Sequence, residues 1–361
     1  MSHGERIAYH LVLAFLSLTV ILFVILLVVI IVWKNNSKKK SNSNEMFYDQ
    51  KSDQESPAST KLCASPYSLV DIDVATDGFN ERRIIGKGRL GTVYAAVLAG
   101  GELVAVKRIH SRLVLRNSGL GSGLISFSSI LKWLSLANHP NVLSILGFSE
   151  GPGERIVVME FMGMMSLEFY LHQNHDGASL LDWSRRLRVA AGVARGLEYL
   201  HEMMAPSILH GCVKPSNILI DVKFSAKVCD YGLSFLAPNE KLDGLVGYVD
   251  QEYWNIEPKG ASKESDVYGL GVVLLELLSG RRSEGGLIVK WSLPLIKEMR
   301  MDEVLDPRLV VPSDIKPLVR LAKVASACVG NSRKNRPLIG QVVAILNDLQ
   351  DEIMQWSNGS F

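Results

Sequence analysis

The chain has 361 residues, and 39 Lys and Arg against 37 Asp and Glu give it a formal charge of +2. This balance argues against a nucleic-acid-binding protein that relies on net positive charge. With 47% apolar and 21% charged residues the chain is not wholly disordered, and its four cysteines are too few for a secreted disulfide scaffold. No two of them form a C-x-x-C pair, so we expect no zinc site. The length allows one large two-lobed domain or two ordinary domains.

An uninterrupted apolar segment lies near the amino terminus. Residues 7–33 contain no charged side chain, and as a helix they would span about 40 Å, against about 30 Å for the hydrocarbon core of a bilayer. A cleaved signal peptide is the alternative, but its apolar region would be shorter and would end at a small-residue cleavage site. This segment ends at Trp33 followed by Lys34. We therefore predict a single transmembrane helix at 11–33, in contact with membrane lipid.

The charges on either side of this segment predict its orientation. Four lysines lie between residues 34 and 40, whereas a single arginine precedes the span. The positive-inside rule then places residues 34–361 in the cytoplasm and leaves 1–10 as a short extracytoplasmic segment. Ten residues cannot bury a core, so this segment is no folded ligand-binding domain. Residues 34–68 are basic and polar, which predicts a disordered juxtamembrane linker.

The pattern changes to that of a folded domain from about Phe79. Short β-like runs separated by glycine turns come first, with a helical stretch at 127–137 among them. From Leu180 the apolar periodicity is mostly helical, and one long helix is ended by Gly280. A small β-rich part followed by a larger α-rich part predicts an α+β fold of two lobes.

A glycine-rich motif, GKGRLGTV at 86–93, lies between two of the strand-like runs. Glycines at this spacing let the backbone approach phosphates, but a similar motif opens dinucleotide-binding folds, where it leads into a helix. Here it leads into strands, the second of which carries the run Val-Ala-Val-Lys107. Ala105 and Lys107 share a face of that strand, so the ammonium can point under the glycine loop. A solvated lysine at a sheet edge is the alternative interpretation of Lys107.

These motifs, in this order, resemble those of a protein kinase, and more narrowly those of plant receptor-like kinases. The run SDVYGLGVVLLELLSGRR is similar to the long helix of their C-terminal lobe, and LIVKWSLPLIKEMRMDEVLDPRL followed by CVGNSRKNRP resembles the Crinkly branch. The resemblance covers 69–350. It implies a protein-kinase fold with an N-terminal lobe at 69–162, a C-terminal lobe at 163–350 and a tail at 351–361. It also implies a single-pass protein of the plasma membrane whose kinase domain is cytoplasmic.

The resemblance implies ATP and Mg²⁺ as ligands. The residues that match the family's nucleotide site are Gly86, Gly88, Gly91, Val93, Ala105, Lys107 and Leu219. Asn217 and Asp230 match its metal ligands. Of the structural residues, Glu252 is expected to pair with Arg336, and Asp266 is expected to cap the backbone of the catalytic loop.

The catalytic loop HGCVKPSN departs from the family pattern. Lys214 and Asn217 match it, but Cys212 occupies the position of the catalytic Asp, and Gly211 that of the preceding Arg. A thiol with a pKa of about 8.5 is mostly protonated at neutral pH and accepts a proton poorly. The loss of a positioned general base costs about 10²–10⁴-fold in rate. A reactive thiol at Cys212 is the alternative to an inert replacement.

The glutamate that pairs with the strand lysine in active kinases is also missing. Alignment places Ile130 at its position, and no Asp or Glu occurs between residues 103 and 149, so no register of the helix supplies one. Lys107 must then rely on phosphates, on Asp230 or on water.

The activation segment lacks the usual phosphorylation switch. No Ser or Thr occurs between residues 235 and 261, and Leu245 occupies the position of the expected threonine. Phosphorylation acts by offering a phosphate to a basic pocket, which in this family includes the arginine replaced by Gly211. Both ends of the switch are therefore absent from the sequence.

The residues that would bind Mg-ATP are mostly kept, and those that would transfer its phosphate are mostly lost. We therefore expect a membrane-anchored pseudokinase that binds Mg-ATP and serves as a signalling scaffold or allosteric partner of an active receptor-like kinase. The alternative is a slow but active Ser/Thr protein kinase in which Asp230, Asn217 and Lys214 suffice. A third possibility is a scaffold that has lost nucleotide binding as well. No nucleic-acid partner is expected.

Overall fold

The computed structural model describes residues 63–118, 126–163, 165–174, 180–236, 245–255 and 260–358. The predicted membrane span and the segments on either side of it, up to residue 62, lie outside these ranges. Within the described ranges no helix has both the length and the apolar character needed to cross a bilayer. The span at 11–33 therefore remains a prediction.

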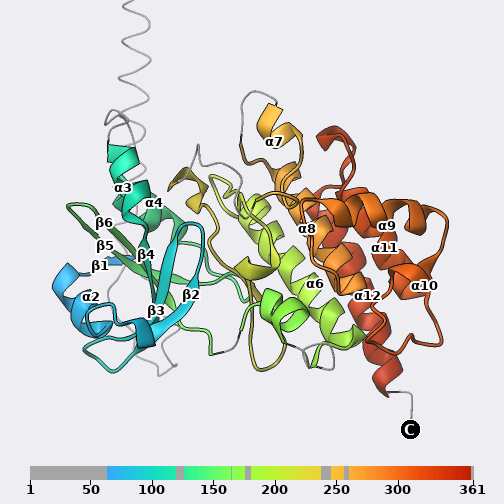
Figure 1. Cartoon of the computed structure of the whole chain (residues 1–361), viewed down its shortest axis with the longest axis horizontal. Helices are drawn as coiled ribbons and strands as arrows, with labels where there is room; N and C mark the ends of the chain where they lie inside the picture. Colours follow the sequence, from blue (N-terminus) through green and yellow to red (C-terminus); the bar gives the residue numbers. More distant parts are fainter. Residues whose placement is uncertain are drawn as a thin grey trace, which may run out of the picture. The chain divides into compact units, whose positions relative to one another are not determined.

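A six-stranded sheet forms the N-terminal lobe, with strand order β1-β5-β6-β4-β3-β2 (Figure 1). β1 pairs in parallel with β5, and the other neighbours are antiparallel. Except for β1, which lies in the predicted linker, the strands fall on the β-like runs expected from the sequence. They are β1 Ser65–Pro66, β2 Ile84–Lys87, β3 Gly91–Val97, β4 Leu103–Ile109, β5 Ile145–Gly151 and β6 Glu154–Glu160.

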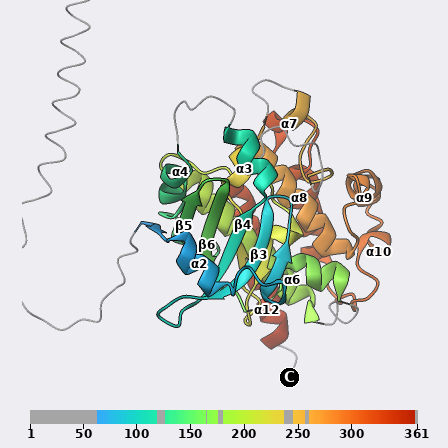
Figure 2. The same ribbon diagram turned by 60° about the vertical axis from the view of Figure 1, so that its left-hand side comes forward.

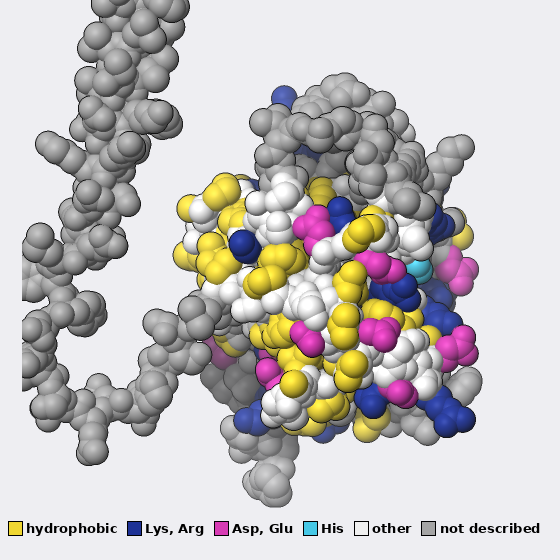
Figure 3. Space-filling view, turned by 90° about the vertical axis from the view of Figure 1, so that its left-hand side faces the viewer, with side chains coloured by type: hydrophobic (Ala, Val, Ile, Leu, Met, Phe, Trp, Pro, Cys, Tyr) yellow, Lys and Arg dark blue, Asp and Glu magenta, His cyan; other side chains and the backbone are white. Residues whose placement is uncertain are grey.

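The alternation of side chains along β4 separates two cores. Val104 and Val106 pack with Ile72 of helix α2 (Leu69–Ala75) on the outer face of the sheet. Ala105 faces the opposite way, into the main core. Figure 2 shows α2 in front of the strands, and Figure 3 shows the outer surface of this lobe, where hydrophobic and charged side chains are interspersed.

Several boundaries in this lobe differ from those expected. Ala64 is buried and β1 pairs with β5, so the folded domain begins within the predicted linker 34–68. The predicted helix 127–137 ends earlier, as α4 Phe127–Leu134, because Ser135 caps it. The lobe also contains α3 Ser111–Ser118, which the apolar pattern did not predict, and the short turn η1 Glu81–Arg83.

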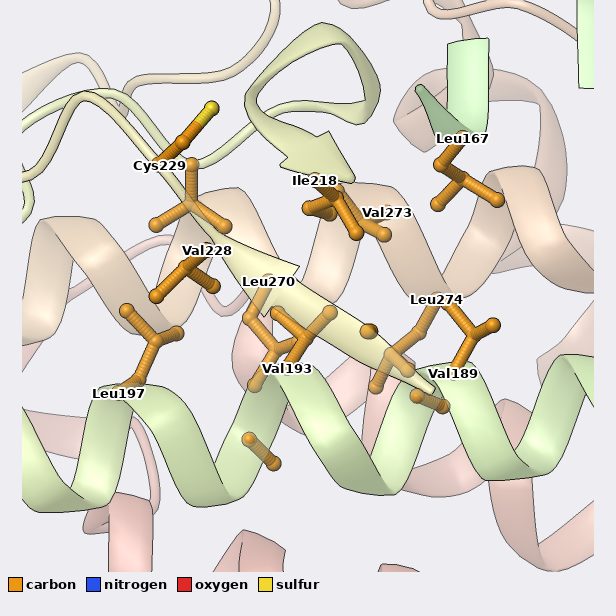
Figure 4. Close-up of a cluster of buried hydrophobic side chains, with 14 of the residues drawn as sticks. Leu167, Val189, Val193, Leu197, Ile218, Val228, Cys229, Leu270, Val273 and Leu274 are labelled. Atoms are coloured by element: carbon orange, nitrogen blue, oxygen red, sulfur yellow. The ribbon is translucent and has the colours of Figure 1, made fainter. Parts of the chain in front are cut away.

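The C-terminal lobe is mainly helical, as expected, and packs around two long helices, α6 and α8. Apolar side chains of α6, α8, β7 and β8 interlock there (Figure 4). The helix α12 continues through most of the segment expected as a tail. The elements are η2 Phe169–Gln173, α6 Trp183–Glu198, η3 Tyr199–Met203, η4 Pro215–Asn217, β7 Ile218–Ile220, β8 Ala226–Val228, η5 Leu233–Leu236, α7 Glu252–Asn255, α8 Lys263–Ser279, α9 Leu287–Lys297, α10 Met301–Val304, α11 Lys316–Cys328, η6 Arg333–Asn335 and α12 Ile339–Asn358.

The core of this lobe positions the chain that enters the site. Val228, at the end of β8, lies in the buried cluster beside Leu197 of α6, and Cys229 follows it (Figure 4). The backbone of Val228 exchanges hydrogen bonds with Asn141 and Leu143, which lead into β5 of the other lobe. Asp230, which follows Cys229, is therefore held in place by both lobes.

Candidate nucleotide-binding cleft

A cavity of about 530 Å³ lies between the sheet and the helical lobe. Its walls come from β2, β3 and β4 on one side, and from the loops around η4, β7 and β8 on the other. Most of the site residues expected from the sequence meet there. Those that line the cavity are Gly86, Gly88, Val93, Ala105, Lys107, Cys212, Lys214, Asn217, Leu219 and Asp230.

The glycine loop is the hairpin between β2 and β3. The N–H of Gly88 donates to the carbonyl of Gly91 at 2.9 Å and closes the turn. Gly91 is not among the residues that line the cavity. A Cβ at Gly91 would lie 2.1 Å from the carbonyl oxygen of Arg108 on β4, so the glycine is required for strand packing. A packing role therefore accounts for the glycine at 91, and its place in the nucleotide site stays a prediction.

Lys107 and Asp230 form an ion pair inside the cavity. In the β3–β4 register Lys107 lies opposite Val93, which brings both side chains to the face that lines the cavity. Lys107 is 4% exposed. Asp230 has φ 63°, a left-handed conformation that costs free energy for a residue with a side chain. Phosphates, Asp230 and water were the three partners expected for Lys107, and the structure contains the second of these.

The helix that lacks the glutamate is held by a different contact. Ile130 is half-buried and packs against the main core. Tyr231, which replaces the Phe of the family motif, is buried, and its hydroxyl donates to the carbonyls of Leu143 at 3.0 Å and Leu134 at 3.4 Å. Burial raises the pKa of Tyr231, so the hydroxyl stays protonated and remains a donor. Sequence analysis missed this link between Asp230-Tyr231 and the end of α4.

The donors for a magnesium ion fit only in part. Mg²⁺ is usually held by one or two carboxylates together with substrate phosphates. Asn217 and Asp230 offer one amide oxygen and one carboxylate, and both line the cavity. The ammonium of Lys107 already compensates that carboxylate. The amide nitrogen of Asn217 donates to the carbonyl of Cys212 at 2.9 Å, which leaves its oxygen available.

Cys212 lies in a small apolar cluster at the far end of the cavity. The buried members are Cys212, Leu245 and Val249, and Tyr253 packs against them. Burial raises the pKa of the Cys212 thiol, while the positive charges of Lys214 and Arg89 act in the opposite direction. The thiol is therefore protonated at neutral pH, which argues against the reactive alternative. Two positions at which the sequence departs from the family, 212 and 245, are thus in one cluster.

The backbone of the catalytic loop is held as the sequence predicts. The carboxylate of Asp266, on α8, accepts hydrogen bonds from the N–H groups of His210 at 2.7 Å and Gly211 at 2.8 Å. The Nε2 atom of His201 lies 2.9 Å from the same carboxylate. Asp266 is buried, so these contacts are shielded from water. The loop geometry therefore survives the loss of its catalytic Asp.

The predicted ion pair between Glu252 and Arg336 is wrong. Arg336 pairs with Asp250, and donates to the carbonyls of Gly330 and Glu264, both at 2.9 Å, which fix its guanidinium. Glu252 begins α7, and its carboxylate accepts the backbone N–H of Arg333 at 2.9 Å. The shorter side chain two residues earlier reaches the buried arginine, and Glu252 caps the neighbouring turn.

Comparisons with known proteins identify the family of this chain. Residues 79–286 match the model of the protein kinase domain. The chain is 33% identical over 313 residues to the proline-rich receptor-like protein kinase PERK15 of Arabidopsis thaliana, covering 82% of this chain and 59% of the relative. It is 35% identical over 286 residues to the serine/threonine-protein kinase-like protein CCR2 of the same plant, a Crinkly-like relative, covering 78% and 34%. It thus spans less than two thirds of either protein.

A solved structure is also similar. Its title describes the pseudokinase domain of BIR2, an immune regulator of the RLK/Pelle family. The TM-score is 0.66 and the sequence identity 32%, with 81% of this chain and 92% of that chain covered. The chain belongs to the protein kinase family, and its relatives are plant receptor-like kinases.

Proposed function

We propose that this protein is a pseudokinase that binds ATP in the cleft and transfers its phosphate poorly or not at all. The observation that carries the proposal is the apolar cluster of Cys212, Leu245 and Val249 at the end of the cavity. A carboxylate is needed there to orient an acceptor hydroxyl and take its proton. An uncharged, buried thiol packed against aliphatic side chains does neither.

The nucleotide part of the proposal rests on the polar residues that remain. Lys107 lies under the glycine loop, and Gly86 and Gly88 line the cavity beside it. ATP is the proposed ligand, and Asn217 and Asp230 are the candidate ligands of Mg²⁺. The Lys107–Asp230 ion pair shows that the lysine has found a partner without the helix glutamate, so the ammonium stays in the cleft.

The cellular role follows from the family and from the predicted membrane span. We propose a protein held in the plasma membrane by residues 11–33, with the kinase-like domain in the cytoplasm. Its partner would be an active receptor-like kinase, which it would contact as a scaffold or allosteric partner. Confinement to a membrane raises the effective concentration of two such partners. The solved relative titled as a pseudokinase and immune regulator supports a signalling role without catalysis.

A slow Ser/Thr kinase is the second candidate, because Lys214, Asn217 and Asp230 all line the cavity near one another. In this reaction, positioning and electrostatics carry much of the rate enhancement, so a missing base need not abolish it.

Radiolabel transfer from ATP to a protein substrate, with the full chain in detergent, separates the two. We expect no incorporation above that of an Asp230→Asn variant. Incorporation that Asp230→Asn abolishes would establish the slow kinase. A thermal shift in ATP with magnesium tests binding separately, because a bound ligand raises the unfolding temperature in proportion to ln(1 + [L]/Kd). The absence of a shift at millimolar ATP would favour a scaffold that binds no nucleotide.

A further inference from the structure

The tip of the glycine loop is held in place by the protein itself. The carbonyl of Gly88 accepts a hydrogen bond from Nε2 of His110 at 3.0 Å. The carbonyl of Leu90 accepts the backbone N–H of the same histidine at 3.0 Å. Leu90 is buried. The residue between these two anchors, Arg89, therefore starts from a fixed backbone.

The side chain of Arg89 enters the far end of the cavity. It lines the cavity together with Cys212 and Lys214. Burial raises the pKa of Cys212 and of Tyr253, and the positive charge of Arg89 opposes the rise at both residues, which locates the guanidinium beside the apolar cluster.

One nitrogen of the Arg89 guanidinium has no acceptor in the described part of the chain. Its Nη1 atom is buried and has no hydrogen-bond partner among the residues that the structure describes. A buried, unpaired donor is costly, most of all when it carries a charge. Such a donor, directed into a cavity, indicates that an anion belongs there.

The acidic residues that line the cavity in the described part of the chain are already engaged. These are Asp230, Glu160 and Glu168. Asp230 pairs with Lys107, Glu160 with Lys227 at 2.8 Å, and Glu168 with Arg282 at 2.8 Å.

Two further carboxylates of the family pattern are absent, because Cys212 and Ile130 occupy their positions. The cleft therefore lacks two carboxylates that the family pattern has, and its remaining candidate metal-binding carboxylate, that of Asp230, is paired with an ammonium.

We propose that Arg89 forms a subsite for the terminal phosphate of a nucleoside triphosphate and takes over the charge compensation that a magnesium ion provides in the family, so that ATP binds without a divalent cation. This inference rests on the proposed nucleotide binding. It adds that an arginine, in place of a divalent cation, balances the charge of the bound phosphates. Arginine suits the role because its planar fork of donors matches phosphate oxygens.

Isothermal titration calorimetry of the full chain in detergent tests the proposal, with ATP, ADP and AMP titrated in EDTA and again in magnesium. We expect ATP to bind in EDTA about as tightly as in magnesium. Arg89→Ala should weaken ATP binding by about tenfold or more, as expected for the loss of a charge-assisted hydrogen bond. It should change AMP binding little, because AMP lacks the phosphate concerned.

Lys87→Ala is the matched control. Lys87 lies in the same loop, lines the same cavity and carries the same charge, but its side chain is exposed. Equal losses in the two variants would mean a diffuse electrostatic effect and would overturn the subsite. Arg89→Lys keeps the charge without the fork and should lie between Arg89→Ala and the unaltered chain. A melting curve for each variant verifies that it is folded.

The remaining outcomes separate this inference from the function on which it rests. ATP binding that requires magnesium would overturn the inference and leave the nucleotide-binding pseudokinase intact. If no nucleotide binds in either buffer, nucleotide binding fails and the subsite fails with it.

Discussion

The side chains at the two ends of the cleft are compensated in different ways, by an ion pair at one end and by apolar packing at the other. At the nucleotide end, Lys107 and Asp230 remain polar and form an ion pair across the lobes. At the acceptor end, Cys212, Leu245 and Val249 have become a small apolar core. The first arrangement keeps groups that a phosphate can engage. The second removes the polar groups that an acceptor hydroxyl would require.

This contrast gives a physical basis for the proposed loss of phosphate transfer without loss of the fold. Removing one member of a buried polar pair leaves its partner unsatisfied, whereas replacing both by apolar groups is nearly neutral for stability. Positions 212 and 245 have both changed and now touch the same cluster. Asp266 still holds the loop above them through its backbone N–H groups. The apolar cluster is therefore packed, and the cavity beside it, which Lys107 and Arg89 line, remains a candidate binding site.

The largest effect is expected from Asp266→Ala, which would undo the support that both ends share. The N–H groups of His210 and Gly211 and the ring of His201 would lose a buried acceptor. We expect the free energy of unfolding to fall by about 3–5 kcal/mol. Urea unfolding followed by circular dichroism measures it. The exposed Asp302→Ala is the control and should stay within about 0.5 kcal/mol of the unaltered chain.

A smaller loss is expected when a carboxylate is returned to the apolar end. Cys212→Asp should lower the free energy of unfolding by about 1–3 kcal/mol, because burial of the new charge against Leu245 and Val249 costs more than its attraction to Arg89 and Lys214 returns. Adding Leu245→Thr to Cys212→Asp should recover part of the lost free energy of unfolding. In a double-mutant cycle we expect an interaction energy of at least about 0.5 kcal/mol between the two positions. Strict additivity would mean that the two positions are independent.

The same variants measure phosphate transfer. Cys212→Asp alone should stay near background because Lys107 still lacks its glutamate, and adding Ile130→Glu should raise transfer more than additively. Strong transfer by the single variant would contradict the importance assigned to that glutamate.

The smallest effect is expected at acid pH, on the ion pairs of Asp250 with Arg333 and Arg336 in the C-terminal lobe. Burial tends to raise the pKa of Asp250, but hydrogen bonds from Arg333 and Arg336 outweigh it, and the pKa is lowered. The unfolded chain then binds this proton more readily, so the stability from Asp250 is fully present above the ordinary carboxyl pKa and is lost as pH falls through the lowered value.

Asp250→Asn should therefore cost about 1–2 kcal/mol at neutral pH. The gap between the two proteins should close progressively below about pH 4. Urea unfolding from pH 7 to pH 3 measures both curves. A gap that is constant with pH would show that the charge of Asp250 contributes nothing to stability.

Much of the fold and part of the site could be predicted from local patterns. Strand alternation and glycine spacing predict the sheet and the loop above Lys107, because both depend on residues close in sequence. The missing glutamate was also visible, since no acidic residue occurs near that helix. The pairing of Arg336 was mispredicted because two acidic residues, Asp250 and Glu252, lie within reach, and only packing decides between them.

Other features had no local signal. Tyr231 reads as a conservative change, yet its hydroxyl donates to a carbonyl at the end of α4 and to one just before β5. Arg89 reads as a solvated loop residue, and its buried nitrogen becomes apparent only when both lobes enclose it.

The sequence by itself determined which chemical groups the cleft contains, because the loss of the acid at 212 and of the glutamate near 130 follows from residue identity. Only the tertiary structure decided the surroundings of the remaining groups: Lys107 pairs with Asp230, Cys212 packs in an apolar cluster, and one buried nitrogen of Arg89 has no partner in the described chain. The physical reason is that desolvation and pairing depend on residues far apart in sequence, and folding alone brings these together.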